Sequence, residues 1–225
     1  MVFRTISCAL LAGFLAGLCL FLIQRSSTLP LIRAAETYEK ANSIESASDA
    51  FATEPVRSLA TLLGDIFVAT AFGLILTGVY AISGRDGWLY GLLCGLVGFA
   101  TFHLAPAMVT PPAVPGMEMA PLGARQIAWW TAAVSAVIAF ILVFKLTWPS
   151  KLVGILFFFV PATVLRLLLP LTASTTQSNS LALLDQAFMI RTLLGMLVFW
   201  LILGGISGYL FARADRKPAS MGAVG

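Results

Sequence analysis

The sequence predicts an all-α polytopic membrane protein, a transmembrane bundle of about six spanning helices. Apolar residues make up 59% of the 225-residue chain and charged residues 11%, whereas about a quarter of a soluble domain is charged. Long apolar stretches recur with the roughly 20 residues that a helix needs to cross a bilayer. They are apolar on every face, unlike barrel strands, which alternate. The expected helices cover residues 5–24, 60–82, 88–108, 126–146, 152–170 and 187–210.

The first stretch is expected to be a mature helix and not a cleaved signal. Its apolar run is too long for a signal peptide and has no small-x-small cleavage site at its end. An outer loop over 25–58 follows. Within it, residues 34–40 (AAETYEK) combine strong helix formers with charges of both signs, which predicts a short surface helix. The Ser- and Asn-rich stretch 42–49 should end that helix.

The later connections differ in character. Residues 83–87 (SGRDG) are short enough to make the second and third helices antiparallel neighbours. Residues 106–123 hold five prolines and are expected to be non-helical, stiff and extended. Residues 172–180 (TASTTQSNS) predict a flexible loop. We expect a single transmembrane domain over 1–214, followed by a short tail at 215–225.

Glycines four residues apart recur in three helices, and this spacing lets helices approach closely. We expect packing within one bundle in preference to a dimer face. The pairs are Gly13/Gly17, Gly91/Gly95 and Gly204/Gly208.

The net charge of +4 is small, and the basic residues are scattered at helix ends. Nucleic acid is therefore not an expected partner, whereas membrane lipid is. Basic residues are denser in the short connections and at the termini than in the longer loops, so the positive-inside rule places both termini in the cytoplasm of a bacterium, with the helices in its inner membrane.

Five ionisable residues at or near the ends of the apolar stretches hold most of the chemical information. Asp65 and His103 should lie about 8 Å below the outer surface, at about 1.5 Å per residue from their helix ends. Arg166 and Arg191 fall at the same level, with Asp185 just above. One polar layer in the outer half of the bundle is predicted, because such groups normally face the protein interior and find partners there.

Two interpretations of this layer stay open. In the first, Asp65 and His103 offer oxygen and nitrogen ligands to a divalent transition metal that enters from outside. In the second, the charges are structural: Asp65 neutralises Arg166 or Arg191, and His103 hydrogen-bonds a carbonyl freed by the proline that follows it. Ligation of a tetrapyrrole by His103 and binding of Cu(I) by the Met-Glu-Met segment at 117–119 are weaker hypotheses. The sequence has no phosphate-binding glycine loop, nucleophile elbow or paired-histidine signature, so no enzyme activity is expected.

The junction of the third and fourth helices carries a family resemblance. It reads GFATFHLAP at 98–106, PPAVPGM at 111–117 and ARQIAWW at 124–130. Together with PLIRAAETYE at 30–39 and FWLILG at 199–204, this ordered set resembles the CbtA family, membrane proteins described as predicted cobalt transporter subunits. The loop motif that carries the resemblance comprises Pro106, Pro111, Pro112, Pro115, Gly116, Arg125 and Gln126.

The resemblance implies that the protein helps cobalt or another divalent metal to cross the membrane, in a hetero-oligomer with CbtB, a small single-span subunit with a His-rich end. The chain departs from the family at two candidate ligands. Ala113 stands where members often have Glu after two prolines, and Ala162 stands where they often have His after a proline. A non-transporting accessory subunit that scaffolds a larger membrane complex is therefore the competing hypothesis.

Overall fold

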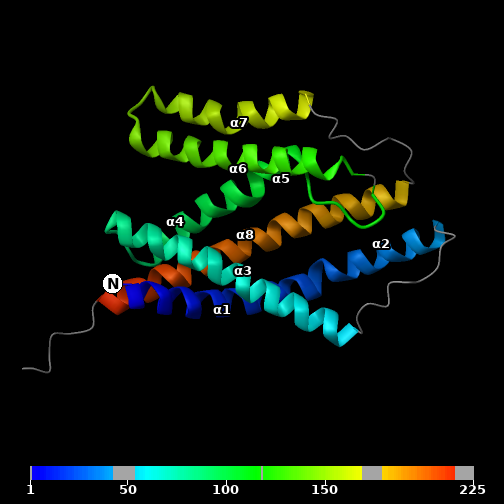
Figure 1. The fold of residues 1–225 in the computed structure, drawn as a ribbon, viewed down its shortest axis with the longest axis horizontal. Coiled ribbons are helices and arrows are strands. Elements are labelled where there is room, and N and C mark those ends of the chain that lie inside the picture. The colour runs from blue at the N-terminus through cyan, green and yellow to red at the C-terminus, as the bar shows by residue number, and fades with distance from the viewer. Residues whose placement is uncertain (1, 43–53, 118, 169–178, 216–225) are drawn as a thin grey trace, which may run out of the picture. The chain divides into compact units, whose positions relative to one another are not determined.

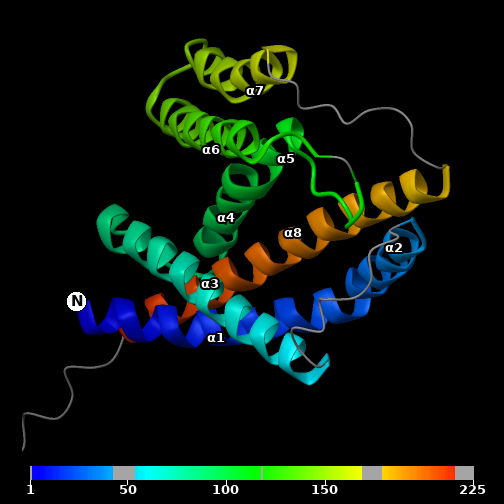
Figure 2. The ribbon, with the colours of Figure 1, turned by 45° about the vertical axis from the view of Figure 1, so that its right-hand side comes forward.

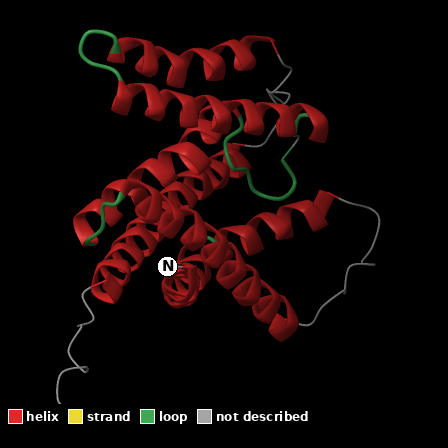
Figure 3. Cartoon of the chain, turned by 60° about the vertical axis from the view of Figure 1, so that its left-hand side comes forward, coloured by secondary structure: helices red, strands yellow, loops and turns green. Residues whose placement is uncertain are grey.

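The computed structural model describes residues 2–42, 54–117, 119–168 and 179–215, and within these residues every regular element is a helix (Figure 3). Among them, six spans are long and apolar enough to cross a membrane, and the third is built from α4, η1 and α5 over Trp88–Val109. The predicted all-α fold is confirmed, and each apolar stretch is helical over nearly all of its described residues. The elements are α1 (Val2–Ser27), α2 (Leu29–Asn42), α3 (Glu54–Ser83), α4 (Trp88–Phe99), η1 (Ala100–Leu104), α5 (Ala105–Val109), α6 (Leu122–Lys145), α7 (Lys151–Leu168) and α8 (Asn179–Asp215).

Several helices extend past the apolar stretches that predicted them. The helix α3 begins at Glu54 instead of residue 60, and α8 has 37 residues instead of the 24 between 187 and 210. At 1.5 Å per residue α8 is about 55 Å long, against a bilayer core of about 30 Å. Hydropathy marks the part of a helix that lipid covers, whereas the hydrogen bonds of the helix continue where the chain turns polar.

The surface helix predicted at 34–40 is α2, which starts earlier, at Leu29, and ends at Asn42. The polar stretches 42–49 and 172–180 lie almost entirely outside the described residues; of the second, Asn179 and Ser180 already belong to α8.

The expectation that residues 106–123 are non-helical was wrong at both ends. Pro106 lies in the first turn of α5, a position at which helices tolerate proline. At the other end α6 starts at Leu122, and the N–H of Arg125 donates to the carbonyl of Pro121 at 3.1 Å. Arg125 and Gln126 therefore lie on α6, within its first two turns. Between the helices, residues 110–121 have no regular structure in the part that is described.

The contacts divide the chain into two compact units. The first comprises Met1–Leu22, Asp49–Leu96 and Leu197–Gly225, and the second Ile23–Ser48 and Val97–Met196. The helix α8 contributes residues to both, as do α1 and α4. The single transmembrane domain over 1–214 stays a prediction.

Small residues build the first unit, in which α1 and α3 are joined by the C-terminal half of α8 (Figure 1). A Cβ atom added to Gly13 would lie 2.5 Å from the Thr70 Cα, and one on Gly17 would lie 2.6 Å from the Ile66 Cα. Gly91 and Gly204 approach each other in the same way between α4 and α8. The glycine pairs thus pack helix against helix within the chain, as expected.

Aromatic side chains are also buried in the first unit. Trp200 and Tyr80 are almost fully buried. The Tyr80 hydroxyl lies 3.1 Å from the Ser207 Oγ and 3.4 Å from the Gly204 carbonyl oxygen, to which it donates. A buried phenol needs such partners because an unpaired hydroxyl costs about 1–3 kcal/mol.

The second unit centres on the helical hairpin of α6 and α7, which lie side by side (Figures 1 and 2). Alanines dominate its core, and their short side chains let α5 pack against both helices. The buried members of this core are Ala105, Val109, Ala128, Ala132, Ala136 and Ala162. This packing holds the segment that follows His103 in a fixed position.

Candidate functional site

His103 lies in a π-helical turn. The η1 segment Ala100–Leu104 interrupts the third span, and the N–H of Ala105 donates to the carbonyl of Ala100, five residues back. Single π turns inside helices are rare and occur frequently at functional sites. The chain's one histidine is therefore placed in the one π turn found among the described residues.

The His103 ring is half-buried and stacks on Phe99, with 6.4 Å between ring centroids and 7° between ring planes. Three residues further on, Pro106 has no N–H and donates nothing to the backbone ladder. The π turn therefore places an imidazole beside backbone carbonyls that do not follow the regular α-helical hydrogen-bond pattern. Imidazole nitrogen and carbonyl oxygen are ligands that suit a borderline divalent cation.

Asp185 of α8 contacts the proline loop, residues 110–121, which follows α5. The Asp185 Oδ1 accepts a hydrogen bond of 2.9 Å from the N–H of Val114, whose side chain is 1% exposed. Two residues on, Gly116 has a φ of +82°, which other residues rarely adopt. The motif residues Pro111, Pro112 and Pro115 flank this anchored valine. Asp185 thus positions the loop motif.

Arg166 and Arg191 each donate to a main-chain carbonyl at the C-terminal end of a helix. Arg166 Nη1 lies 3.3 Å from the Met108 oxygen in α5, and Arg191 Nη1 lies 3.1 Å from the Ser27 oxygen, the last residue of α1. The last carbonyls of a helix lack partners and carry partial negative charge, so a guanidinium is favourable there. Ion pairing among Arg166, Arg191 and Asp185 stays a prediction, since the polar contacts described for them are all to the main chain.

Asp65 lies in the middle of α3 and is half-buried. It belongs to the first unit, whereas His103 belongs to the second. Their joint role stays a prediction. Within the part of the chain that is described, no group of three or more His, Cys, Asp or Glu side chains gathers to hold a metal ion.

Sequence reasoning missed the π turn and the carbonyl acceptors of Arg166 and Arg191. No residue pattern specifies a π turn. For the arginines a signal existed, because each lies near the end of an apolar stretch, but their carbonyl acceptors lie far away along the chain. Arg125, also in the loop motif, donates to the Met119 sulfur at 3.5 Å, so this thioether has a polar contact within the chain.

Six apolar spans within the described residues, with a histidine-bearing π turn in the third, define a polytopic α-helical membrane protein. A family model described as "Probable cobalt transporter subunit (CbtA)" matches residues 2–212. The chain belongs to the CbtA family, which confirms the resemblance drawn from the sequence. No curated protein and no solved structure gives a significant match.

Proposed function

We propose that this protein is the multi-pass subunit of a transporter for cobalt or another divalent transition metal, with His103 and Asp65 as polar residues on the metal path. Family membership supports the transporter role. The observation that carries the choice of His103 is its position in a π turn within a membrane span. No catalytic chemistry is part of the proposal.

A neutral imidazole and a carboxylate match the ligands that divalent transition metals accept, but two side chains do not complete a coordination shell. We propose that backbone oxygens, water and a small single-span, His-rich CbtB-like subunit supply the rest. A hetero-oligomer follows from this proposal, since the metal would pass from the partner's histidines to His103.

The guanidinium groups of Arg166 and Arg191 in the second unit would repel a cation, unless negative groups offset their charge. Arg166 and Arg191 both donate to carbonyls at helix ends. The end of a helix is equivalent to about half a negative charge, so each contact offsets part of the guanidinium charge. This arrangement supports a path that admits a divalent cation.

Metal uptake by cells tests the proposal. A strain that lacks the gene should regain cobalt accumulation with the wild-type protein. His103→Ala and Asp65→Asn should each reduce the initial rate of cobalt uptake by about tenfold or more, because the loss of one ligand that contributes about 1.4 kcal/mol lowers affinity tenfold. The matched control is Glu54→Gln, which removes an exposed carboxylate from the same helix as Asp65. Wild-type rates in both test variants, at equal protein levels in the membrane, would refute the roles of these residues.

The second candidate is an accessory subunit that scaffolds a larger membrane complex without transport. The absence of a three-ligand cluster among the described residues favours it. Purification of the tagged full chain in mild detergent distinguishes the two. A His-rich small subunit in the complex supports transport, whereas a large stable assembly without it, in cells whose cobalt uptake does not depend on the gene, supports the scaffold.

We also propose the bacterial inner membrane as the location, with both termini in the cytoplasm. Alkaline phosphatase is active only outside the cytoplasm, so a fusion within residues 43–53 should be active and a fusion after residue 215 inactive. The reverse pattern would invert the orientation.

A further inference from the structure

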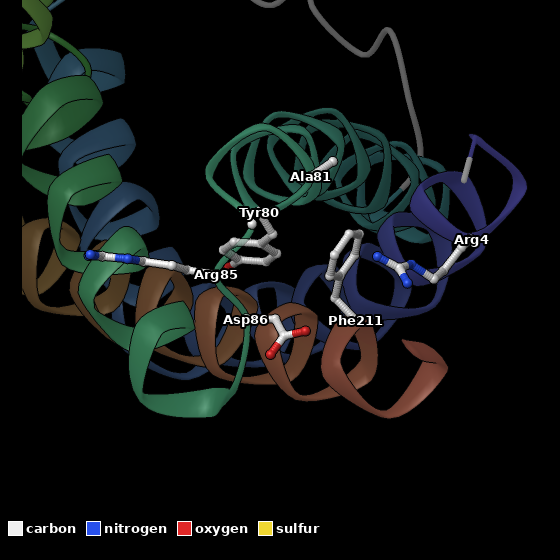
Figure 4. A pocket seen from close by; sticks show the side chains of 7 residues that line it. Arg4, Tyr80, Ala81, Arg85, Asp86 and Phe211 are labelled. Carbon is white, nitrogen blue, oxygen red and sulfur yellow. The ribbon is translucent and has the colours of Figure 1, made fainter. Parts of the chain in front are cut away.

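A cavity of about 400 Å³ in the first unit has no role in the metal path proposed above. It lies where three membrane-spanning helices begin or end, and Figure 4 shows it from close by. Arg4 comes from the start of α1, Phe211 from the end of α8, and Tyr80 from the last turn of α3. Arg85 and Asp86 line it from the short turn between α3 and α4.

The cavity presents charges of both signs beside aromatic rings. The guanidinium carbon of Arg4 lies 4.1 Å from the centre of the Phe211 ring, a contact that holds this cation at the wall. In Figure 4 the Asp86 carboxylate lies below the Tyr80 and Phe211 rings, and Arg85 extends to the left, on the side of Tyr80 that faces away from Arg4. A ligand that carries a negative and a positive group can therefore meet a partner for each.

The position of the cavity indicates the source of the ligand. The ends of spanning helices lie at the level of the lipid head groups, whichever membrane surface this is. Trp88, which opens α4 next to the cavity turn, is 56% exposed, and exposed tryptophan is enriched at this level of a membrane. Basic pockets between spanning helices bind lipid phosphates.

We propose that this cavity binds the zwitterionic phosphoethanolamine head group of a membrane lipid. The phosphate lies against Arg4, and the ammonium lies against Asp86. A purely anionic lipid leaves Asp86 facing negative charge. A phosphocholine lipid has no N–H to donate to the carboxylate. The site therefore selects phosphoethanolamine over both.

Native mass spectrometry of the full-length protein in detergent measures this selectivity. Dioleoyl lipids with phosphoethanolamine, phosphoglycerol or phosphocholine head groups are titrated separately. Wild-type protein is expected to bind the phosphoethanolamine lipid at least about tenfold more tightly than the other two. This is the effect expected from one hydrogen bond to a charged group, which only the phosphoethanolamine lipid makes. Equal affinity for the three lipids would overturn the proposal.

Variants separate the two halves of the site. Asp86→Asn should abolish the preference over the phosphoglycerol lipid, and Arg4→Gln should weaken the binding of both of these lipids. If Arg4→Gln does not fold, Arg4→Lys is the second test, because it keeps the cation and should keep the preference for phosphoethanolamine. The control Arg213→Gln removes an exposed cation near the same end of α8, where it donates to the Tyr209 hydroxyl and does not line the cavity. It should bind as wild type. An Asp86→Asn variant with wild-type preference would refute the ammonium site.

Soluble glycerophosphoethanolamine distinguishes a lipid from a soluble metabolite. It carries the same head group without acyl chains, so it should compete at least about tenfold more weakly than the lipid, because it lacks the apolar surface that the acyl chains bury. Competition at equal concentration would overturn the assignment to a membrane lipid.

Discussion

The contact between α4 and α8 offers a sharp test of the structure, through Gly208→Ala. A Cβ atom at this position would meet the Gly87 carbonyl oxygen at 2.5 Å and the Gly91 Cα at 2.9 Å. Both are backbone atoms, so no side-chain rotation relieves the clash. Ordinary contact starts near 3.4 Å, so the two backbones must separate by about 0.9 Å, the difference between these distances, which van der Waals packing resists.

That separation also breaks a hydrogen bond. The Gly87 N–H donates to the Gly208 carbonyl at 3.3 Å, already near the limit for a hydrogen bond. Overpacking costs about 1–3 kcal/mol and a lost hydrogen bond about 0.5–1.5 kcal/mol, while alanine in a helix regains about 1 kcal/mol over glycine. Together these terms lead us to expect that Gly208→Ala lowers the free energy of unfolding by about 0.5–3.5 kcal/mol.

The neighbouring Gly205→Ala is the matched control. Its added Cβ would meet only the Leu92 side chain, at 3.4 Å, so the propensity gain should remain and stability should be unchanged or higher by up to about 1 kcal/mol. Unfolding in sodium dodecyl sulfate, followed by tryptophan fluorescence, measures both variants. If Gly208→Ala proved as stable as Gly205→Ala, the close approach of α4 and α8 would be wrong.

Three further outcomes are expected. Asp185→Ala should speed hydrogen exchange at the Val114 amide by about tenfold or more, because a charged acceptor is lost, and Asp185→Asn should restore much of the protection; equal exchange in all three proteins would contradict the anchor. Tyr80→Phe should lower the free energy of unfolding by about 1 kcal/mol in the same assay, and the double variant with Ser207→Ala should lose less stability than the two single variants together. Full additivity of the two changes would argue against the contact between Tyr80 and Ser207. Ala132→Leu should destabilise by about 1–3 kcal/mol because this position is 1% exposed in a core of small side chains, while Ala132→Ser should be tolerated.

Hydropathy predicted the spans because burying a backbone in lipid forces a helix on any long apolar stretch. It did not predict the helix ends, since α3 and α8 continue through polar residues where lipid no longer decides. Proline was over-weighted as a breaker at Pro106, which lies in the first turn of α5. Pro161 lies inside α7, within the helix predicted at 152–170. In both helices the packing of the segment outweighs a single missing donor.

The candidate site was predictable in its residues and not in its geometry. The scarcity of ionisable groups within apolar stretches was enough to single out His103 and Asp65. The π turn at Ala100–Leu104 was not predicted, because the sequence pattern of the third span is the same for an α-helical and a π-helical turn. The carbonyl acceptors of Arg166 and Arg191 lie 58 and 164 residues away along the chain, a separation that no local pattern bridges.

The sequence by itself determined the membrane-spanning helical fold, the family and the short list of polar residues, because these depend on composition, on hydrophobic runs about as long as the bilayer is thick and on ordered motifs. Only the tertiary structure decided which glycines meet, where the prolines are helical and what each charged group contacts. Those outcomes depend on differences of a few tenths of an ångström in the spacing between segments that are far apart in the chain, and close packing fixes this spacing.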